Sequence, residues 1–154
     1  DLVTGVQTCA LPIFIAGVPV PATQTYTVTV ASGTLYIVGG TGNAFYLDGS
    51  RDMSLSIAKD TVIKFSQDGS SNDNHPLFIT TSNSTNISTL RSGVISSDVV
   101  YYLDGTSNQT DYTSTSNFNA ASQRYVEWTP STTGTYYYAC WIHGIGMGGM
   151  ITIT

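Results

Sequence analysis

The strongest constraint on the fold of this chain is a series of short segments that alternate polar and apolar residues and are separated by turn-forming clusters. QTYTVTV (24–30), MSLSI (53–57) and RYVEWTP (124–130) alternate with a period of two residues, which is typical of strands with one buried face. The dipeptide DG at 48–49 and the cluster GGTGN (39–43) are turn signals between such segments. Counting segments in this way gives roughly eight or nine short strands. We therefore predict an all-β fold, a Greek-key antiparallel β-sandwich.

Several other segments carry weaker signals, and their structures are expectations. The cluster ASG (31–33) is expected to end the first strand, after which TLYIV (34–38) resumes as a strand. Residues 82–97 and 107–123 are rich in Ser, Thr and Asn, so we expect polar loops there. The chain closes on GMITIT (149–154), which alternates again and predicts a terminal strand.

The balance of charged and apolar residues narrows the class of protein. The 154 residues suit a single domain with a real core, since 41% are hydrophobic and only 10% are charged. Five Lys and Arg residues and a formal net charge of −5 argue against binding to nucleic acid, which requires basic clusters. No apolar run is long enough to span a bilayer. A composition rich in Ser, Thr and Asn and poor in Lys favours an extracytoplasmic location (periplasmic or secreted) or a virion surface, and leaves the oligomeric state open.

The first residues of the chain differ in style from the rest of the sequence. We assign residues 1–22 to a leader and residues 23–154 to the folded domain. The opening stretch DLVTGVQTCALPIF resembles the translation of a sequencing-adapter read-through. In that case the leader is not native protein, and Cys9 has no role.

Two alternatives for the leader stay open. LPIFIAGVPVPA has the apolar stretch of a signal peptide and ends on a small residue, Ala22, at the cleavage point. Cys9 could instead carry a lipid, although the preceding VQT fits that interpretation poorly. In every case the domain begins near Thr23, and we do not expect a disulfide between Cys9 and Cys140.

Three residues with metal-binding side chains lie close together near the C-terminus. Cys140, His143 and Met147 have the spacing C-x2-H-x3-M, in a Gly-rich loop between two predicted strands. Thiolate and thioether are soft ligands that favour copper, and two imidazoles with one thiolate and a weak axial Met form the blue-copper electron-transfer arrangement. The chain has one other His, His75, at the point where a polar loop enters the predicted strand HPLFITTS. From there its imidazole could reach across the end of a sandwich.

This C-terminal segment resembles that of the cupredoxins, a family that includes plastocyanin, pseudoazurin and amicyanin. The resemblance rests on the pattern G-x-Y-x-Y-x-C-x2-H-x3-M, on the closing strand and on the upstream His75. It implies a cupredoxin-like domain that binds one copper and carries single electrons, not an enzyme. His75, Cys140 and His143 would be the equatorial ligands and Met147 the axial one. Met150 is the rival axial candidate, although we expect it to be a core residue of the terminal strand.

The residues around these ligands depart from the family pattern. Asn74 precedes the first His and Pro76 follows it, whereas the family often has Asn after this His. Because Pro76 has no N–H to donate near the thiolate, the resemblance does not fix the reduction potential. Trp141 stands where the family has a small residue, and its bulk is expected to crowd or shield the metal. With Ile142 and Ile145 it is expected to form an apolar rim suited to a weak, transient redox partner.

A second class of function stays open beside electron transfer by His143, the expected electron port. Endings of the form C-x-x-H…MGG, and phrases such as GTGNAFYLDG, also resemble marine phage fibre and virion proteins. On that interpretation the domain is a structural or adhesion module of a virion or cell surface, with metal absent or only stabilising. Enzymes with further copper centres, such as multicopper oxidases and nitrite reductases, need more His than the two in this chain. A zinc site would rarely use Met.

Overall fold

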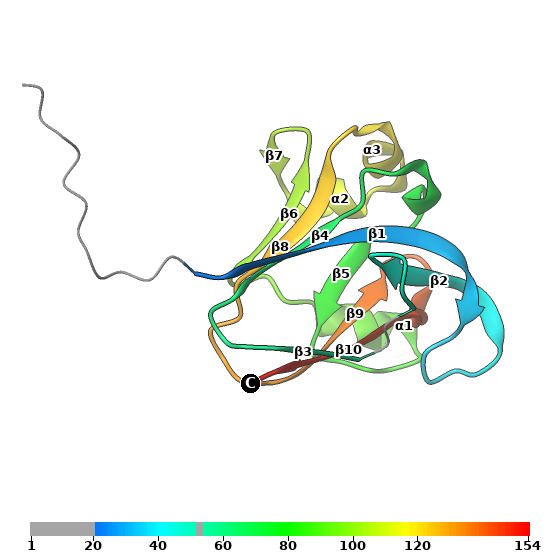
Figure 1. Ribbon diagram of the computed structural model, residues 1–154. Helices are drawn as coiled ribbons and strands as arrows, with labels where there is room; N and C mark the ends of the chain where they lie inside the picture. The colour runs from blue at the N-terminus through cyan, green and yellow to red at the C-terminus, as the bar shows by residue number, and fades with distance from the viewer. Residues whose placement is uncertain (1–20, 52–53) are drawn as a thin grey trace, which may run out of the picture.

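The alternating segments assemble into two β-sheets packed face to face, in the computed structural model that describes residues 21–51 and 54–154 (Figure 1). The first sheet contains, in spatial order, β2 (Thr41–Leu47), β1 (Thr23–Thr34), β4 (Val62–Ser66), β8 (Arg124–Trp128), β6 (Val99–Leu103) and β7 (Thr106–Ser107). The second contains β3 (Ser54–Ile57), β10 (Gly144–Ile153), β9 (Gly134–Cys140) and β5 (Leu77–Thr80). The predicted β-sandwich is therefore confirmed.

The period-two alternation decides which side chains enter the core. In β8, Val126 and Trp128 are buried, whereas Tyr125 and Glu127 on the other face are half exposed. Burial of each large apolar side chain stabilises the fold by about 1.5–3 kcal/mol. The largest fully buried side chains come from both sheets and from the segments between them: Tyr112, Tyr138, Phe45, Phe65, Phe78, Phe118, Ile63, Leu77, Ile79, Leu90, Ile145 and Ile151.

Most of the strand pairs are antiparallel, as predicted, but each sheet also contains one parallel pair. β1 pairs antiparallel with β2 but parallel with β4, and β10 pairs antiparallel with β9 but parallel with β3. The described residues contain ten strands, slightly more than the alternating segments suggested. Alternation identifies a strand and its buried face, but it carries no information about the direction of the neighbouring strand.

The first strand is longer than its sequence suggested. The cluster ASG does not end β1, because Ala31, Ser32 and Gly33 continue to pair with β2. The predicted strand TLYIV is instead mostly a turn, in which Ile37 has a φ of +52° and Leu35 donates to the Gly40 carbonyl. Ile37 and Val38 are about half exposed, so apolar content alone gave the wrong structure for this segment.

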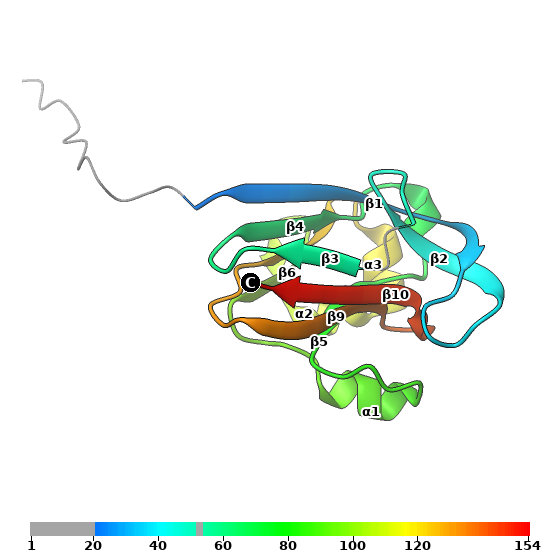
Figure 2. The ribbon, with the colours of Figure 1, turned by 60° about the horizontal axis from the view of Figure 1, so that its bottom comes forward.

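The two segments predicted as polar loops contain short helices. They are α1 (Ile87–Ser92), α2 (Gln109–Thr113) and α3 (Thr115–Ala120). Asn86 and Asn108 cap the first two helices, since each side chain accepts hydrogen bonds from two backbone N–H groups. One apolar side chain from each helix is buried: Leu90, Tyr112 and Phe118. Figure 2 shows α1 beside the sheet edge formed by β5, where the Thr80 hydroxyl donates to the Leu90 carbonyl.

Two predictions concern the start of the chain and the membrane. Nearly all of the predicted leader, including Cys9, lies outside the described residues. Within residues 21–51 and 54–154, no helix is long and apolar enough to cross a membrane.

Candidate metal centre

Three of the predicted ligands lie together at one end of the sandwich. Cys140 Sγ is 3.8 Å from His75 Nδ1 and 3.4 Å from His143 Nδ1. The two imidazole rings have centroids 4.6 Å apart. One ligand atom from each residue can be chosen so that all lie within 4.8 Å of one another. This spacing allows a single metal ion to contact all three side chains.

Strand register places Cys140 beside the His75 segment. Cys140 is the last residue of β9 and pairs with Leu77, the first residue of β5. His75 lies two residues before Leu77 and is therefore close to Cys140. The chain then turns back, and Gly144, with a φ of +85°, pairs with Cys140 to begin β10. Within that turn the His143 N–H donates to Cys140 Sγ at 3.5 Å. A pairing between strands distant in sequence therefore creates the site.

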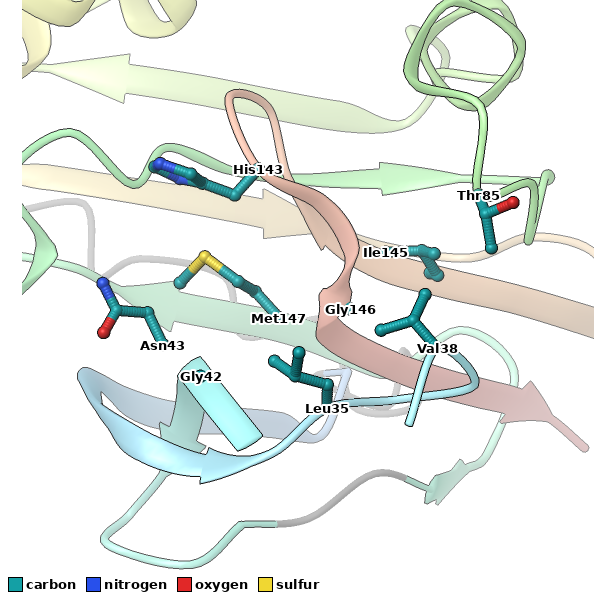
Figure 3. Close-up of a pocket in the computed structure, with 9 residues that line it drawn as sticks. All are labelled: Leu35, Val38, Gly42, Asn43, Thr85, His143, Ile145, Gly146 and Met147. Carbon is teal, nitrogen blue, oxygen red and sulfur yellow. The ribbon is translucent and has the colours of Figure 1, made fainter. Parts of the chain in front are cut away.

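The structure favours Met147 over Met150 as a fourth donor. Met147 is buried and lines the same cavity as His143, where Figure 3 shows its sulfur on the side of that imidazole. Met150 is half exposed and pairs with Tyr137 in β10. Ile151 is buried on the opposite face of the strand, so the expectation that Met150 is a core residue is wrong. The apolar residues of β10 that alternate into the core are Ile151 and Ile153, whereas the sequence suggested Met150.

A cavity of about 320 Å³ opens beside these donors (Figure 3). Its walls are mainly apolar, with His143, Asn43 and Thr85 as polar exceptions. The remaining lining residues are Leu35, Val38, Gly42, Ile145, Gly146 and Met147. An apolar wall limits the access of water to the donors, which strengthens electrostatic interactions there.

Burial sets the protonation states of the two buried donors. It raises the pKa of the Cys140 thiol to about 11, although backbone N–H groups of the following turn and the charge of Arg91 act in the opposite direction. Burial also lowers the pKa of His75, helped by His143 and opposed by Asp73. Near neutral pH the free site therefore holds a neutral His75 and a protonated thiol. A metal that binds to the thiolate must displace one proton.

The residues flanking His75 stabilise its backbone and do not contact the sulfur through a hydrogen bond. Asn74 has a φ of +68°, a conformation that Asn tolerates better than most residues. Its N–H donates to Asn119 Oδ1 at 2.8 Å, and Asn119 Nδ2 donates back to Asn74 Oδ1 at 3.0 Å. The Pro76 carbonyl accepts from the Trp141 N–H at 2.8 Å, which ties the His75 segment to the turn that carries His143.

The predicted apolar rim is only partly present. Trp141 is half-buried, and its ring packs edge-on against Phe78 with centroids 5.2 Å apart. Ile142 is half-buried and His143 is exposed. Ile145 is only 2% exposed, so the prediction that it contributes to an exposed rim is wrong. The turn at Gly144 directs the Ile145 side chain inward, where it lines the cavity.

Two arginines that sequence analysis missed stabilise the turn and the strand after it. Arg91 donates from Nε and Nη2 to the Trp141 carbonyl, and its guanidinium lies 4.7 Å from the centre of the Trp141 ring. Arg51 donates to the carbonyls of Gly146 and Gly148 at 3.4 and 3.0 Å. The chain has only five Lys and Arg residues, and this scarcity was the one sequence signal that an individual arginine has a structural role. Their partners are backbone carbonyls, which leave no signal in the sequence.

No known family profile and no curated protein matches this sequence. Solved structures match its fold. The copper protein rusticyanin superposes with a TM-score of 0.51 and 17% identity, over 88% of this chain and 80% of that one. An NMR structure of reduced rusticyanin gives 0.50 and 15%, over 86% and 77%. Auracyanin B gives 0.46 and 22%, over 90% and 93%. The rusticyanin match shows that this chain has the cupredoxin fold, as the resemblance implied.

Proposed function

We propose that this protein binds one copper ion through His75, Cys140, His143 and Met147 and carries single electrons. The observation that supports this most is the convergence of two imidazoles and a thiol within 4.8 Å, at the end of a sandwich with the cupredoxin fold. A buried thioether beside them completes the donor set of a blue-copper site. Bound copper would supply the one-electron Cu(II)/Cu(I) couple.

The protein's own contribution is a rigid, mostly dry set of donors. Cys140 and Met147 are buried and His75 is 8% exposed, so their positions depend on packing and change little when charge is added or removed. His143 is exposed and lies beside the cavity, which makes it the route by which an electron would enter or leave. Trp141 and Ile142 would present half-buried apolar surface there to a weakly bound redox protein.

The composition, rich in Ser, Thr and Asn and poor in Lys, supports an extracytoplasmic location, where the redox partner would also be found. The test is subcellular fractionation of the native host, in which recovery with the cytoplasmic fraction would contradict this part of the proposal.

A titration of the metal-free chain with Cu(II), followed by visible absorption, tests the proposed function. We expect an intense thiolate-to-copper band that saturates at one equivalent, because Cys140 is positioned beside both imidazoles. Cys140→Ala should abolish the band and leave the far-ultraviolet circular dichroism unchanged. Met150→Leu is the matched control, since Met150 lies outside the cavity, and it should keep the band.

A folded wild-type chain that stays colourless would overturn the proposal. The domain would then have kept the fold without the chemistry, as expected of a structural module on a virion or cell surface. A band retained in Cys140→Ala would show that copper binds elsewhere.

A further inference from the structure

A buried glutamine near the candidate site uses all of its hydrogen-bonding capacity. Gln67 is fully buried. Its Nε2 donates to Asn72 Oδ1 at 3.1 Å and to the His75 carbonyl at 2.8 Å. Its Oε1 accepts from the Leu77 N–H at 2.8 Å and from the Tyr112 hydroxyl at 2.6 Å. A glutamine amide has two donor hydrogens and two acceptor lone pairs, so this side chain is saturated.

Two of these bonds fix the two peptide groups that follow His75, one on each side of Pro76. Gln67 accepts from the N–H of Leu77 and donates to the carbonyl of His75 itself. Pro76 lies between them, and its ring restricts φ. A third bond, from the His75 N–H to the Asn72 carbonyl at 2.8 Å, closes the other end of the segment. The backbone that carries the imidazole is therefore restrained at each neighbouring peptide.

Gln67 is in turn fixed by its backbone. Its N–H donates to the Arg124 carbonyl at 2.7 Å, and its own carbonyl accepts from Arg124 Nε at 2.9 Å. Arg124 is 2% exposed and also forms an ion pair with Asp73 at 2.7 Å. The glutamine therefore connects the core strand β8 to the segment of the candidate ligand.

The insertion between β7 and β8 supplies the last contacts. Tyr112, on α2, is fully buried, and its ring packs edge-on against Phe118 of α3 with centroids 5.2 Å apart. Its hydroxyl reaches Gln67, while Asn119 of α3 pairs with Asn74. The segment that looked like a surface loop in the sequence thus contacts the His75 segment at two points.

We propose that Gln67, fixed by Tyr112 and Arg124, is the positioning residue for His75, and that it sets the place of the imidazole before any metal is bound. The inference deepens the proposed function and rests on it for its purpose. It requires that the restraint exist in the metal-free chain. Loss of that restraint would allow the imidazole to move away from Cys140.

Gln67→Met and Tyr112→Phe test the inference, with Tyr101→Phe as the matched control. Gln67→Met removes all four bonds while keeping a similar volume. Tyr112→Phe removes only the hydroxyl that restrains Gln67 and therefore still allows a test if Gln67→Met does not fold. Tyr101 is also buried and its ring lies 5.3 Å from that of Tyr112, but its hydroxyl bonds to Ile79 and Ile95 instead.

The first measurement is amide hydrogen exchange of the metal-free chains, normalised to the global stability of each variant. We expect the His75 and Leu77 amides to exchange at least about threefold faster in Tyr112→Phe than in Tyr101→Phe, because a local opening of this segment becomes easier. Equal exchange in the two variants would overturn the inference. This readout requires no copper, so it stays decisive if the wild-type chain binds none and the proposed function fails.

The second measurement is the dissociation rate and visible spectrum of the Cu(II) complexes. If the wild-type chain binds copper, we expect about tenfold faster loss of the metal and a shifted band in Gln67→Met. Tyr101→Phe should keep the wild-type band. A Gln67→Met chain with the wild-type spectrum and dissociation rate would show that Gln67 has no positioning role, even if its unfolding temperature were lower.

Discussion

The two parts of the candidate metal centre are stabilised in different ways. The ligand loop (residues 140–147) runs from the end of β9 into β10 and brings Cys140, His143 and Met147 together within a few residues. The His75 segment (residues 67–76) contributes one donor, and two side chains distant in sequence, Tyr112 and Arg124, fix it through Gln67. Strand pairing closes the loop and two arginines bind its backbone carbonyls, whereas the segment depends on a buried polar network.

This difference explains where each part is vulnerable. Backbone hydrogen bonds between β9 and β10 are shared among many residues, so one lost side chain affects the loop only locally. In the buried network each polar group depends on particular partners, and removal of one leaves others unpaired in a medium of low dielectric constant. Substitutions in the two parts should therefore differ in size and in kind.

The largest effect is expected at Arg124, which is central to the network. Its guanidinium donates to the carbonyls of Gln67, Asp68, Gly69 and Phe118 as well as to Asp73. Arg124→Met should lower the free energy of unfolding by about 3–5 kcal/mol, because it removes a buried guanidinium and leaves several carbonyls and Asp73 without their donor. Urea denaturation measures this difference.

The control for Arg124 is the exposed end of the same ion pair. The Asp73 side chain is 43% exposed, so Asp73→Asn should cost well under half as much, since water can replace the lost contact. If the two variants were equally destabilised, the charge pair would explain the effect and the carbonyl contacts would not.

The next largest effect is expected directly after the ligand loop, where the backbones of β9 and β10 approach closely. A Cβ at Gly148 would lie 1.7 Å from the Tyr138 carbonyl oxygen, so the two strands must separate to accept alanine. Gly148→Ala should cost about 3 kcal/mol in urea denaturation, as overpacking against a backbone cannot relax. Gly146→Ala is the matched variant, because its Cβ would meet side chains and no backbone, the nearest being Val38 at 3.0 Å, and it should cost less. Equal costs would contradict the close approach of β9 and β10.

The same contrast explains how much the sequence could predict. The spacing of Cys140, His143 and Met147 is local, so it identified the loop and, through the family resemblance, the fold. His75 followed because the chain has only one other His. Gln67 and Arg124 could not be predicted, because most of their partners are backbone groups and because Tyr112 and Arg124 lie far from Gln67 in sequence. Alternation likewise identified strands but neither their direction nor the helices within polar segments.

In the metal-free chain the two parts of the candidate site should affect stability at opposite ends of the pH range. The folded pKa of Cys140 is raised from 9.0 to about 11, so the stability it contributes is complete below pH 9 and is lost as the pH rises toward 11. One pKa unit corresponds to about 1.4 kcal/mol, which gives a loss of about 2–3 kcal/mol. Urea denaturation of wild type and Cys140→Ser across this range measures it, and parallel pH profiles would contradict the raised pKa.

The His75 segment should respond on the acid side. Burial lowers the folded pKa of His75 below its ordinary value of 6.5. The stability that this neutral imidazole contributes is therefore complete above pH 6.5, and it is lost as the pH falls from there through the lowered folded pKa. In His75→Gln, which cannot titrate, the stability should depend less steeply on pH between pH 7 and 5. An unchanged slope would show that the imidazole is not held in a buried, neutral state.

The smallest effect is expected where the loop meets α1, at Arg91. Its guanidinium donates to the Trp141 carbonyl and lies over the Trp141 ring, so it restrains the turn that carries His143. Arg91→Gln should cost only about 1–2 kcal/mol, because this site is partly exposed and backbone pairing still shapes the turn. If the loop is shaped by its strands, the Cu(II) band of this variant should keep its wavelength, in contrast to that of Gln67→Met. A shift as large as in Gln67→Met would mean that the loop also depends on distant side chains, and the distinction between the two parts would fail.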